Sequence, residues 1–197
     1  MKFKYYFLIL TLLFTNIFSF SQSDSTDRKT MFVLKTDIVI PFIALIEKGR
    51  IASLTLEYGF NNHFSVQLTG LYSKSSTNTY QKILEKYIIE DFKFFTQKSK
   101  SPFSGFYIGV YSDQIFDYAY GNPTPSEFIE YKTTQLSIGP VVGYQNHFHK
   151  KLVFDFIFGI GRSFEIDRKI IRDEGVNLVI IPFPIDIRLA FNFGYRF

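Results

Sequence analysis

Few residues in this chain of 197 residues have the types and spacing that catalysis or metal binding requires. The chain has no cysteine, which excludes thiolate metal sites, cysteine nucleophiles and disulfide bonds. The histidines are His63, His147 and His149. The last two could bind a metal as a His-x-His pair, but no acidic residue is near them, so we predict no metal site. No serine stands in a Gly-x-Ser-x-Gly frame, and Gly159-x-Gly161 lacks the later glycine and the helix of a phosphate-binding loop. We predict no catalytic residue and no cofactor.

The most unusual segment that could bind a ligand is 113–130, which is rich in acidic and aromatic residues. It contains Asp113, Asp117, Glu127 and Glu130, and it has no lysine or arginine. We predict a long exposed loop that could bind a cation, a glycan or a basic partner. The alternative is a solvated loop whose aromatic side chains lie at a membrane interface.

A second set of charged residues alternates with apolar residues along predicted strands. An almost balanced set of five acidic and four basic side chains suits a closed interior of ion pairs, because an isolated buried charge is very costly. We therefore predict pairing and packing for these residues, rather than a proton path or a ligand site. The set comprises Lys35, Asp37, Glu57, Asp91, Lys93, Asp155, Asp186, Arg188 and Arg196.

The elements that must position these residues are predicted from an alternation with a period of two. It is clearest over 185–197, where apolar residues take every odd position. Only a strand points successive side chains to opposite faces over such a length. Residues 81–89 also fit a helical spacing and could be a short helix in a loop or the start of the fourth strand. The pattern predicts seven further strands, at 32–40, 53–60, 64–69, 91–94, 106–111, 135–145 and 152–161.

The predicted connections between strands alternate in length. An up-and-down antiparallel sheet places alternate connections at opposite ends, and outer-membrane barrels have short periplasmic turns and longer extracellular loops. We therefore predict an all-β fold, an eight-stranded antiparallel up-and-down transmembrane β-barrel over 31–197, with all three histidines in periplasmic turns. The connections run long, short, long, short, long, short, long, at 41–50, 61–63, 74–86, 96–102, 113–130, 146–151 and 163–179.

Glycine indicates which face points inward. Small residues suit the narrow interior of a small barrel, so a glycine-rich polar face favours a membrane barrel over a soluble carrier with an apolar interior. At eight strands, side chains just fill the interior, so no wide pore is expected. Eight of the 12 glycines lie on the polar face: Gly59, Gly105, Gly109, Gly139, Gly143, Gly159, Gly161 and Gly194.

The first residues have the pattern of a secretory signal peptide. Lys2 and Lys4 precede an uncharged apolar stretch over 5–20, and Ser19 and Ser21 provide the small residues of a cleavage site. We predict a signal peptide over 1–21 and a flexible lead-in over 22–30. The alternative, an uncleaved anchor, is disfavoured because a spanning helix needs about 20 apolar residues.

Several stretches resemble known proteins. Tyr195 and Phe197 resemble the C-terminal signal by which the barrel-assembly machinery reads outer-membrane barrels. More of the chain resembles an uncharacterised family of small outer-membrane β-barrels, catalogued as a domain of unknown function, except at Glu90, where proline is expected. The resemblance implies fold and location but no activity. It rests on Leu34-Lys35-Thr36-Asp37, Asp91-Phe92-Lys93-Phe94-Phe95, Gly105-Phe106-Tyr107-Ile108-Gly109, Gly143-Tyr144-Gln145, Asp155 with Gly159 and Gly161, and 192–197.

These observations together predict a protein of the outer membrane of a Gram-negative bacterium with a structural or surface-interaction role. We expect a monomer whose partners are outer-membrane lipids and the barrel-assembly machinery, with a surface ligand that the sequence does not identify. The net charge of +4 is too weak to indicate nucleic acid. The alternative function is that of an outer-membrane lipid-modifying enzyme, a hydrolase or acyltransferase. Such enzymes generally keep their chemistry near the outer leaflet, whereas the histidines are predicted at the opposite end.

Overall fold

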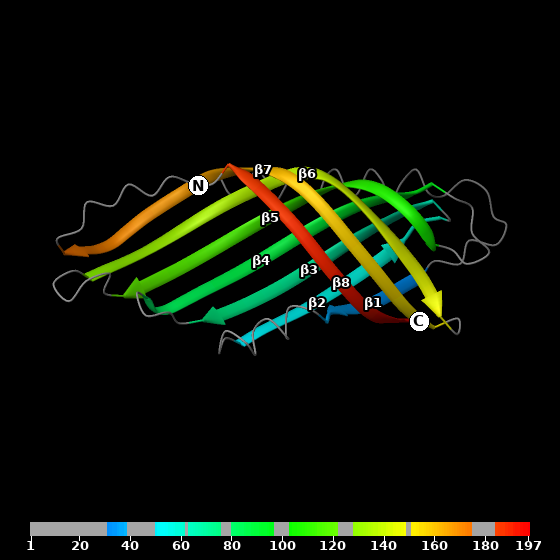
Figure 1. The fold of residues 1–197 in the computed structure, drawn as a ribbon, viewed down its shortest axis with the longest axis horizontal. Helices are drawn as coiled ribbons and strands as arrows, with labels where there is room; N and C mark the ends of the chain where they lie inside the picture. The colour runs from blue at the N-terminus through cyan, green and yellow to red at the C-terminus, as the bar shows by residue number, and fades with distance from the viewer. Residues whose placement is uncertain are drawn as a thin grey trace.

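Eight antiparallel strands form a closed barrel in which each strand pairs with its neighbours in sequence and β1 pairs with β8 (Figure 1). The computed structural model describes residues 31–38, 50–61, 63–75, 80–96, 103–121, 128–148, 151–174 and 184–197. The predicted eight-stranded up-and-down barrel is confirmed. The strands are β1 (Met31–Asp37), β2 (Arg50–Gly59), β3 (Phe64–Ser75), β4 (Tyr80–Phe95), β5 (Gly105–Gly121), β6 (Phe128–Phe148), β7 (Leu152–Glu174) and β8 (Ile185–Arg196).

The predicted alternation sets which side chains point inward. In β1, buried and exposed residues alternate without interruption, with Lys35 and Asp37 inside and Leu34 outside. In β8, Arg188 is buried whereas Leu189, the next residue, is 55% exposed. The polar face therefore lines the lumen, and the apolar face covers the outside of the barrel.

The barrel has two ends that differ in construction. At the end that we call the turn end, β2 is joined to β3, β4 to β5 and β6 to β7; the loop end is the opposite one. Strands β4 to β7 are 16, 17, 21 and 23 residues long, and in Figure 1 they continue towards the loop end past the shorter β8 and β1. No described residue belongs to a helix long and apolar enough to cross a membrane.

The predicted alternation of long and short connections is wrong. Strands β3 and β4 are separated only by 76–79, because 81–89 is the start of the fourth strand rather than a loop helix. Strand β7 likewise continues through the predicted connection at 163–179 as far as Glu174. Strands that extend beyond the regular apolar pattern keep pairing with their neighbours, so the sequence pattern underestimates their length.

The predicted exposed loop at 113–130 is also wrong in extent. Strand β5 continues to Gly121 and β6 begins at Phe128, so most of this segment is paired sheet. A loop would expose its acidic residues, but Asp113 is only 5% exposed, because it points into the lumen. Asp117 is half-buried, Glu130 lies on β6, and Glu127 lies outside the described residues, as do the predicted signal peptide and lead-in.

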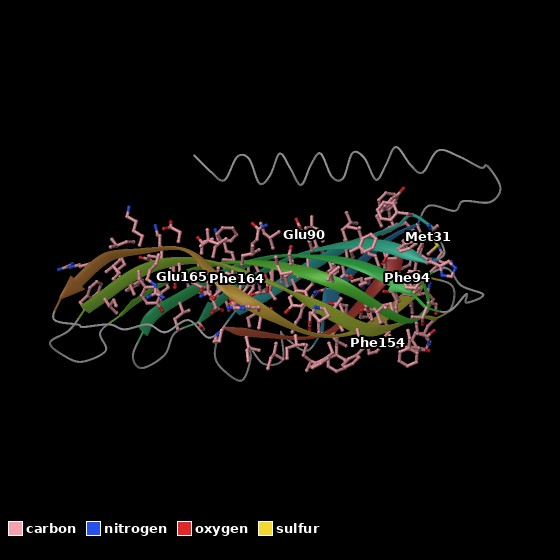
Figure 2. All side chains as sticks on the ribbon, turned by 90° about the horizontal axis from the view of Figure 1, so that it is seen from above. Met31, Glu90, Phe94, Phe154, Phe164 and Glu165 are labelled. Carbon is pink, nitrogen blue, oxygen red and sulfur yellow. The ribbon has the colours of Figure 1, made fainter. Side chains whose placement is uncertain are left out.

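The outer face of the barrel is apolar over a broad belt. The outward-facing positions of β8 from Ile185 to Tyr195 carry no charge, and those of β5 from Phe106 to Gln114 carry none. Ile187 is 64% exposed and Phe106 is 61% exposed. Aromatic side chains gather on this belt at the turn end, where Phe94 and Phe154 lie in Figure 2. Ring pairs there include Phe106 with Tyr144, Phe64 with Phe94, and Tyr195 with Phe197.

Candidate functional site in the barrel lumen

A cluster of four buried charges fills the lumen towards the turn end; we call it the ion-pair cluster. It consists of Lys35, Glu57, Lys93 and Asp155, from β1, β2, β4 and β7, and each is at most 2% exposed. The Lys35 ammonium lies 2.6 Å from both Glu57 and Asp155. The Lys93 ammonium lies 2.8 Å from Asp155 and 3.6 Å from Glu57. Two cations thus neutralise two carboxylates away from water.

Uncharged side chains complete the hydrogen bonds of this cluster. The Gln67 amide oxygen accepts from both ammonium groups, at 3.0 Å from Lys35 and 2.8 Å from Lys93. Lys35 also donates to Gln145 at 2.8 Å, and the Tyr107 hydroxyl donates to Asp155 at 2.8 Å. A buried ion pair stabilises a fold only when additional hydrogen bonds reach its charged groups, and these residues supply such bonds to both lysines and to Asp155.

Glycine makes room for the rings that close the turn end. A Cβ at Gly143 would lie 2.3 Å from the Tyr107 hydroxyl oxygen, so only glycine lets this ring cross the lumen to Asp155. Phe103 is 2% exposed, lies over Gly59, and packs against Phe95 with ring centroids 5.8 Å apart. The lumen is therefore filled at the turn end.

A second ion pair lies above the ion-pair cluster, towards the loop end. The Arg188 guanidinium binds Asp91 with two nitrogens, one of them at 2.9 Å. Gln67 donates to the same carboxylate at 2.9 Å and so links it to the cluster below. Beside this pair, the Tyr111 hydroxyl donates to Asp186 at 2.6 Å.

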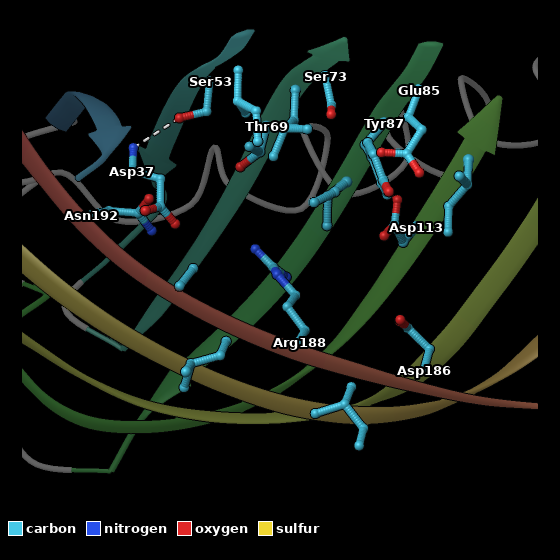
Figure 3. Close-up of a pocket in the computed structure, with 17 residues that line it drawn as sticks. Asp37, Ser53, Thr69, Ser73, Glu85, Tyr87, Asp113, Asp186, Arg188 and Asn192 are labelled. Carbon is cyan, nitrogen blue, oxygen red and sulfur yellow. Dashed lines mark hydrogen bonds between the residues drawn. The ribbon is translucent and has the colours of Figure 1, made fainter. Parts of the chain in front are cut away.

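Beyond Arg188 the lumen opens into a hollow of about 370 Å³, which we call the acidic cavity. Four carboxylates line it, from Asp37, Glu85, Asp113 and Asp186, and Arg188 is the basic residue among the described lining. In Figure 3, Glu85, Tyr87 and Asp113 lie on one wall, and Arg188 and Asp186 of β8 lie on the other. Hydroxyl and aliphatic side chains also line it, among them Ser53, Thr69, Ser73, Ile51, Leu71, Ile89 and Ile115.

Asp117 extends this acidic lining towards the loop end. It lies opposite Glu85 in the β4–β5 ladder and beyond the apolar belt, which on β5 gives way to Ser112 and Gln114. Burial and then the nearby Glu85 carboxylate raise the pKa of Asp117 to about 6, and a hydrogen bond from Thr133, at 3.2 Å, opposes this rise. Among the described residues, the loop-end lumen thus holds more carboxylates than cations, since the Arg188 guanidinium of the cavity is bound to Asp91.

The remaining predicted residues contact groups outside the two ion pairs, although Asp37 also lines the acidic cavity. The Asp37 backbone amide donates to Ser53 at 2.9 Å, and Arg196 lies 3.2 Å from a ring nitrogen of His147. A ring nitrogen of His63 lies 3.0 Å from the Phe95 carbonyl oxygen. Both described histidines are at the turn end, but His147 lies on β6 rather than in a turn, because β6 continues to Phe148. His149 lies outside the described residues.

The sequence interpretation missed the uncharged half of the lumen and one wall of the acidic cavity. Gln67 and Gln145 lie on the inward face of their strands, but only the closed ring brings them to the same lysine. The sequence pattern does not identify Glu85 and Tyr87 as lumen residues, because the segment 81–89 fits both a helix and a strand. Its odd positions, continued from Asp91, would have indicated the inward face.

Two chemistries follow from this arrangement. The ion-pair cluster is dry and its charges are matched by opposite charges, which suits a structural core. The acidic cavity is open and negatively charged, which suits a cation. Part of its wall is aliphatic. Among the described residues, no three histidine or carboxylate side chains converge as metal ligands.

Comparison with known proteins identifies a family. A family described as "Protein of unknown function (DUF3575)" matches residues 9–174. No curated protein is significantly similar to the chain. One solved structure, the N-terminal β-barrel domain of OprF from Pseudomonas aeruginosa, matches with a TM-score of 0.45 and 11% identity, over 87% of this chain and 100% of that one. The resemblance to a family of unknown function is confirmed.

Proposed function

Because the chain belongs to the DUF3575 family of proteins of unknown function, we propose its function from its own surfaces: it is a β-barrel of the outer membrane of a Gram-negative bacterium. The single observation that carries this proposal is the apolar belt on the outer face. Soluble monomers rarely expose contiguous apolar patches larger than a few hundred Å². Here large aliphatic and aromatic side chains are exposed on every strand, including Leu54, Ile108 and Leu189.

The closed sheet supports the same proposal. Within a bilayer every backbone polar group needs a protein partner, and a closed barrel meets this need because it has no free edge. The ladder from β1 back to β8 closes the ring in this chain. The aromatic side chains at the turn end match the girdle that such barrels place at the membrane interface. The turn end is then periplasmic and the loop end extracellular.

The filled lumen favours a structural or surface-interaction role over that of a diffusion pore. Tyr107, Phe95 and Phe103 close the turn end, and the ion-pair cluster occupies the space behind them. A barrel of eight strands has an interior just wide enough for such side chains, whereas porins have 16 or more strands. On this proposal, ligands would reach the protein from the extracellular end or from the lipid.

Tyr195 and Phe197 support a proposed encounter with the barrel-assembly machinery. Both rings are on the outer face, 39% and 74% exposed, with their centroids 5.2 Å apart. They lie at the turn end, the side from which periplasmic assembly factors would act. Changing both to alanine should lower the amount of assembled barrel while export continues.

Cell fractionation combined with heat modifiability tests the proposal. We expect the protein in the outer-membrane fraction, and unheated samples should migrate differently from boiled ones on a detergent gel, because a closed sheet opens only cooperatively. Recovery in the soluble periplasmic fraction would overturn the membrane location.

A further inference from the structure

The acidic cavity contains a carboxylate that its surroundings do not satisfy. Asp113 is 5% exposed, and its Oδ1 atom is buried without a hydrogen-bond partner among the described residues. Arg188 faces the same cavity, but its two hydrogen bonds to a carboxylate go to Asp91. A buried polar atom without a partner is costly, and a native structure that keeps one needs an explanation, such as a bound ion or ligand.

The charge around Asp113 indicates the sign of the missing partner. Four carboxylates line the cavity and the one guanidinium of the described lining is already paired. Glu85 and Asp113 stand on β4 and β5, whereas Asp186 and Asp37 stand on β8 and β1, across the ring. A cation, or a molecule with two cationic groups, would be attracted to both walls.

The spacing and the lining indicate what kind of cation it is. The carboxylates are distributed around the wall, and no three of the described acidic or histidine side chains converge as metal ligands. Between them lie the aliphatic side chains of Ile51, Leu71, Ile89 and Ile115, which suit methylene groups. The volume of about 370 Å³ falls in the range of small-molecule sites.

We propose that the acidic cavity binds a small aliphatic diamine, with one ammonium group on Asp113 and Glu85 and the other on the Asp186 side. The aliphatic wall packs against the carbon chain, and the Ser53, Thr69 and Ser73 hydroxyls accept the remaining ammonium hydrogens. Binding takes place inside the lumen and does not rest on the membrane location of the barrel.

Calorimetric titration of the purified full chain in detergent micelles tests this inference, with cadaverine as the probe. The diol of the same chain length controls for packing alone, and magnesium chloride controls for charge alone. We expect heat of binding with cadaverine only, and Asp113→Asn should weaken it by about tenfold because a charge-assisted hydrogen bond is lost. The matched control is Asp167→Asn, at an exposed carboxylate on β7, which should bind as the natural chain does.

Each outcome decides the proposal. Equal binding by Asp113→Asn, binding of the diol, or binding of magnesium in place of cadaverine would overturn it. The Asp113→Asn protein should fold, because the change removes an unpartnered charge, and its unheated gel mobility checks this. Glu85→Gln provides a second variant, for which we expect a smaller loss of affinity. Failure of the fractionation experiment would leave this result intact, because both measurements use different properties of the molecule.

Discussion

The two halves of the lumen belong to the same barrel and follow the same alternation, yet they differ in charge balance. Towards the turn end, Lys35 and Lys93 neutralise Glu57 and Asp155, and glutamine and tyrosine side chains add hydrogen bonds to these charges. Towards the loop end, carboxylates face a cavity and Asp113 has an unpartnered oxygen. A polar interior can therefore serve as a core or as a site, and the difference lies in whether each charge is matched.

The comparison also explains where space is left. Where opposite charges pair, side chains draw together and fill the lumen. Where like charges line the wall, they cannot approach one another without a counter-charge, and a hollow remains. We therefore expect the ion-pair cluster to stabilise the folded barrel. We expect the acidic cavity to destabilise it and to be able to bind a ligand.

The largest expected effect comes from removing a cation from the filled half. Lys93→Met leaves Asp155 and Glu57 with one ammonium group between them, so the free energy of unfolding should fall by about 3–5 kcal/mol. Asp113→Asn, in the acidic cavity, should be neutral or stabilising because it removes an unmatched charge. Urea unfolding of both variants in detergent measures the contrast. Equal losses in the free energy of unfolding would contradict the difference between the two halves.

A charge on the outer face should be nearly as costly. Leu189→Arg places a guanidinium in the apolar belt and should cost about 2–4 kcal/mol near the middle of a bilayer. Ser112→Arg, at the loop-end edge of the belt and beside Glu90, is the matched control and should cost about 1 kcal/mol or less. Refolding into lipid vesicles measures both, and similar costs would argue against a belt in contact with lipid.

Overpacking the filled half should have a moderate effect. The Cβ of Gly143→Ala would clash with the Tyr107 hydroxyl and displace it from Asp155, at a cost of about 1–3 kcal/mol. A Cβ at Gly70 would meet nothing within 4 Å, so Gly70→Ala is the control. If both variants unfold at the same urea concentration, the turn-end lumen is looser than its contacts indicate.

The smallest expected effect is the pH dependence that Asp117 imposes on the loop end. Its pKa is raised to about 6 in the folded chain, from 3.8 without these surroundings, so the folded state holds a proton that the unfolded state has lost. Its contribution to stability is therefore present at low pH and falls as pH rises from about 4 through 6.

The corresponding variant is Asp117→Asn. It should stabilise the barrel at pH 8 by about 1 kcal/mol, since solvent screens this half-buried group, and should have no such effect at pH 4. The midpoint of thermal unfolding at the two pH values measures the change, with Asp167→Asn as the control. A larger gain at pH 4 would contradict the sign.

The period of two determined much of this protein from sequence alone. Because successive strand residues point to opposite faces, the pattern of 185–197 already placed Arg188 inside and Leu189 outside. Glycine on the polar face indicated a narrow interior, where Gly143 now faces Tyr107. These properties are local to one strand, so they can be predicted without knowing its neighbours.

The tertiary structure alone decided which residues meet and where the lumen is hollow. Gln67 and Gln145 share Lys35 although they are distant in sequence, because ring closure and register bring β3 and β6 to β1. The loop-end lengths of β4 to β7 depend on pairing between neighbours, so Asp113 changed from an expected loop residue to a buried wall of the cavity. Charge balance across a closed ring is a property of all eight strands together, and no single segment contains it.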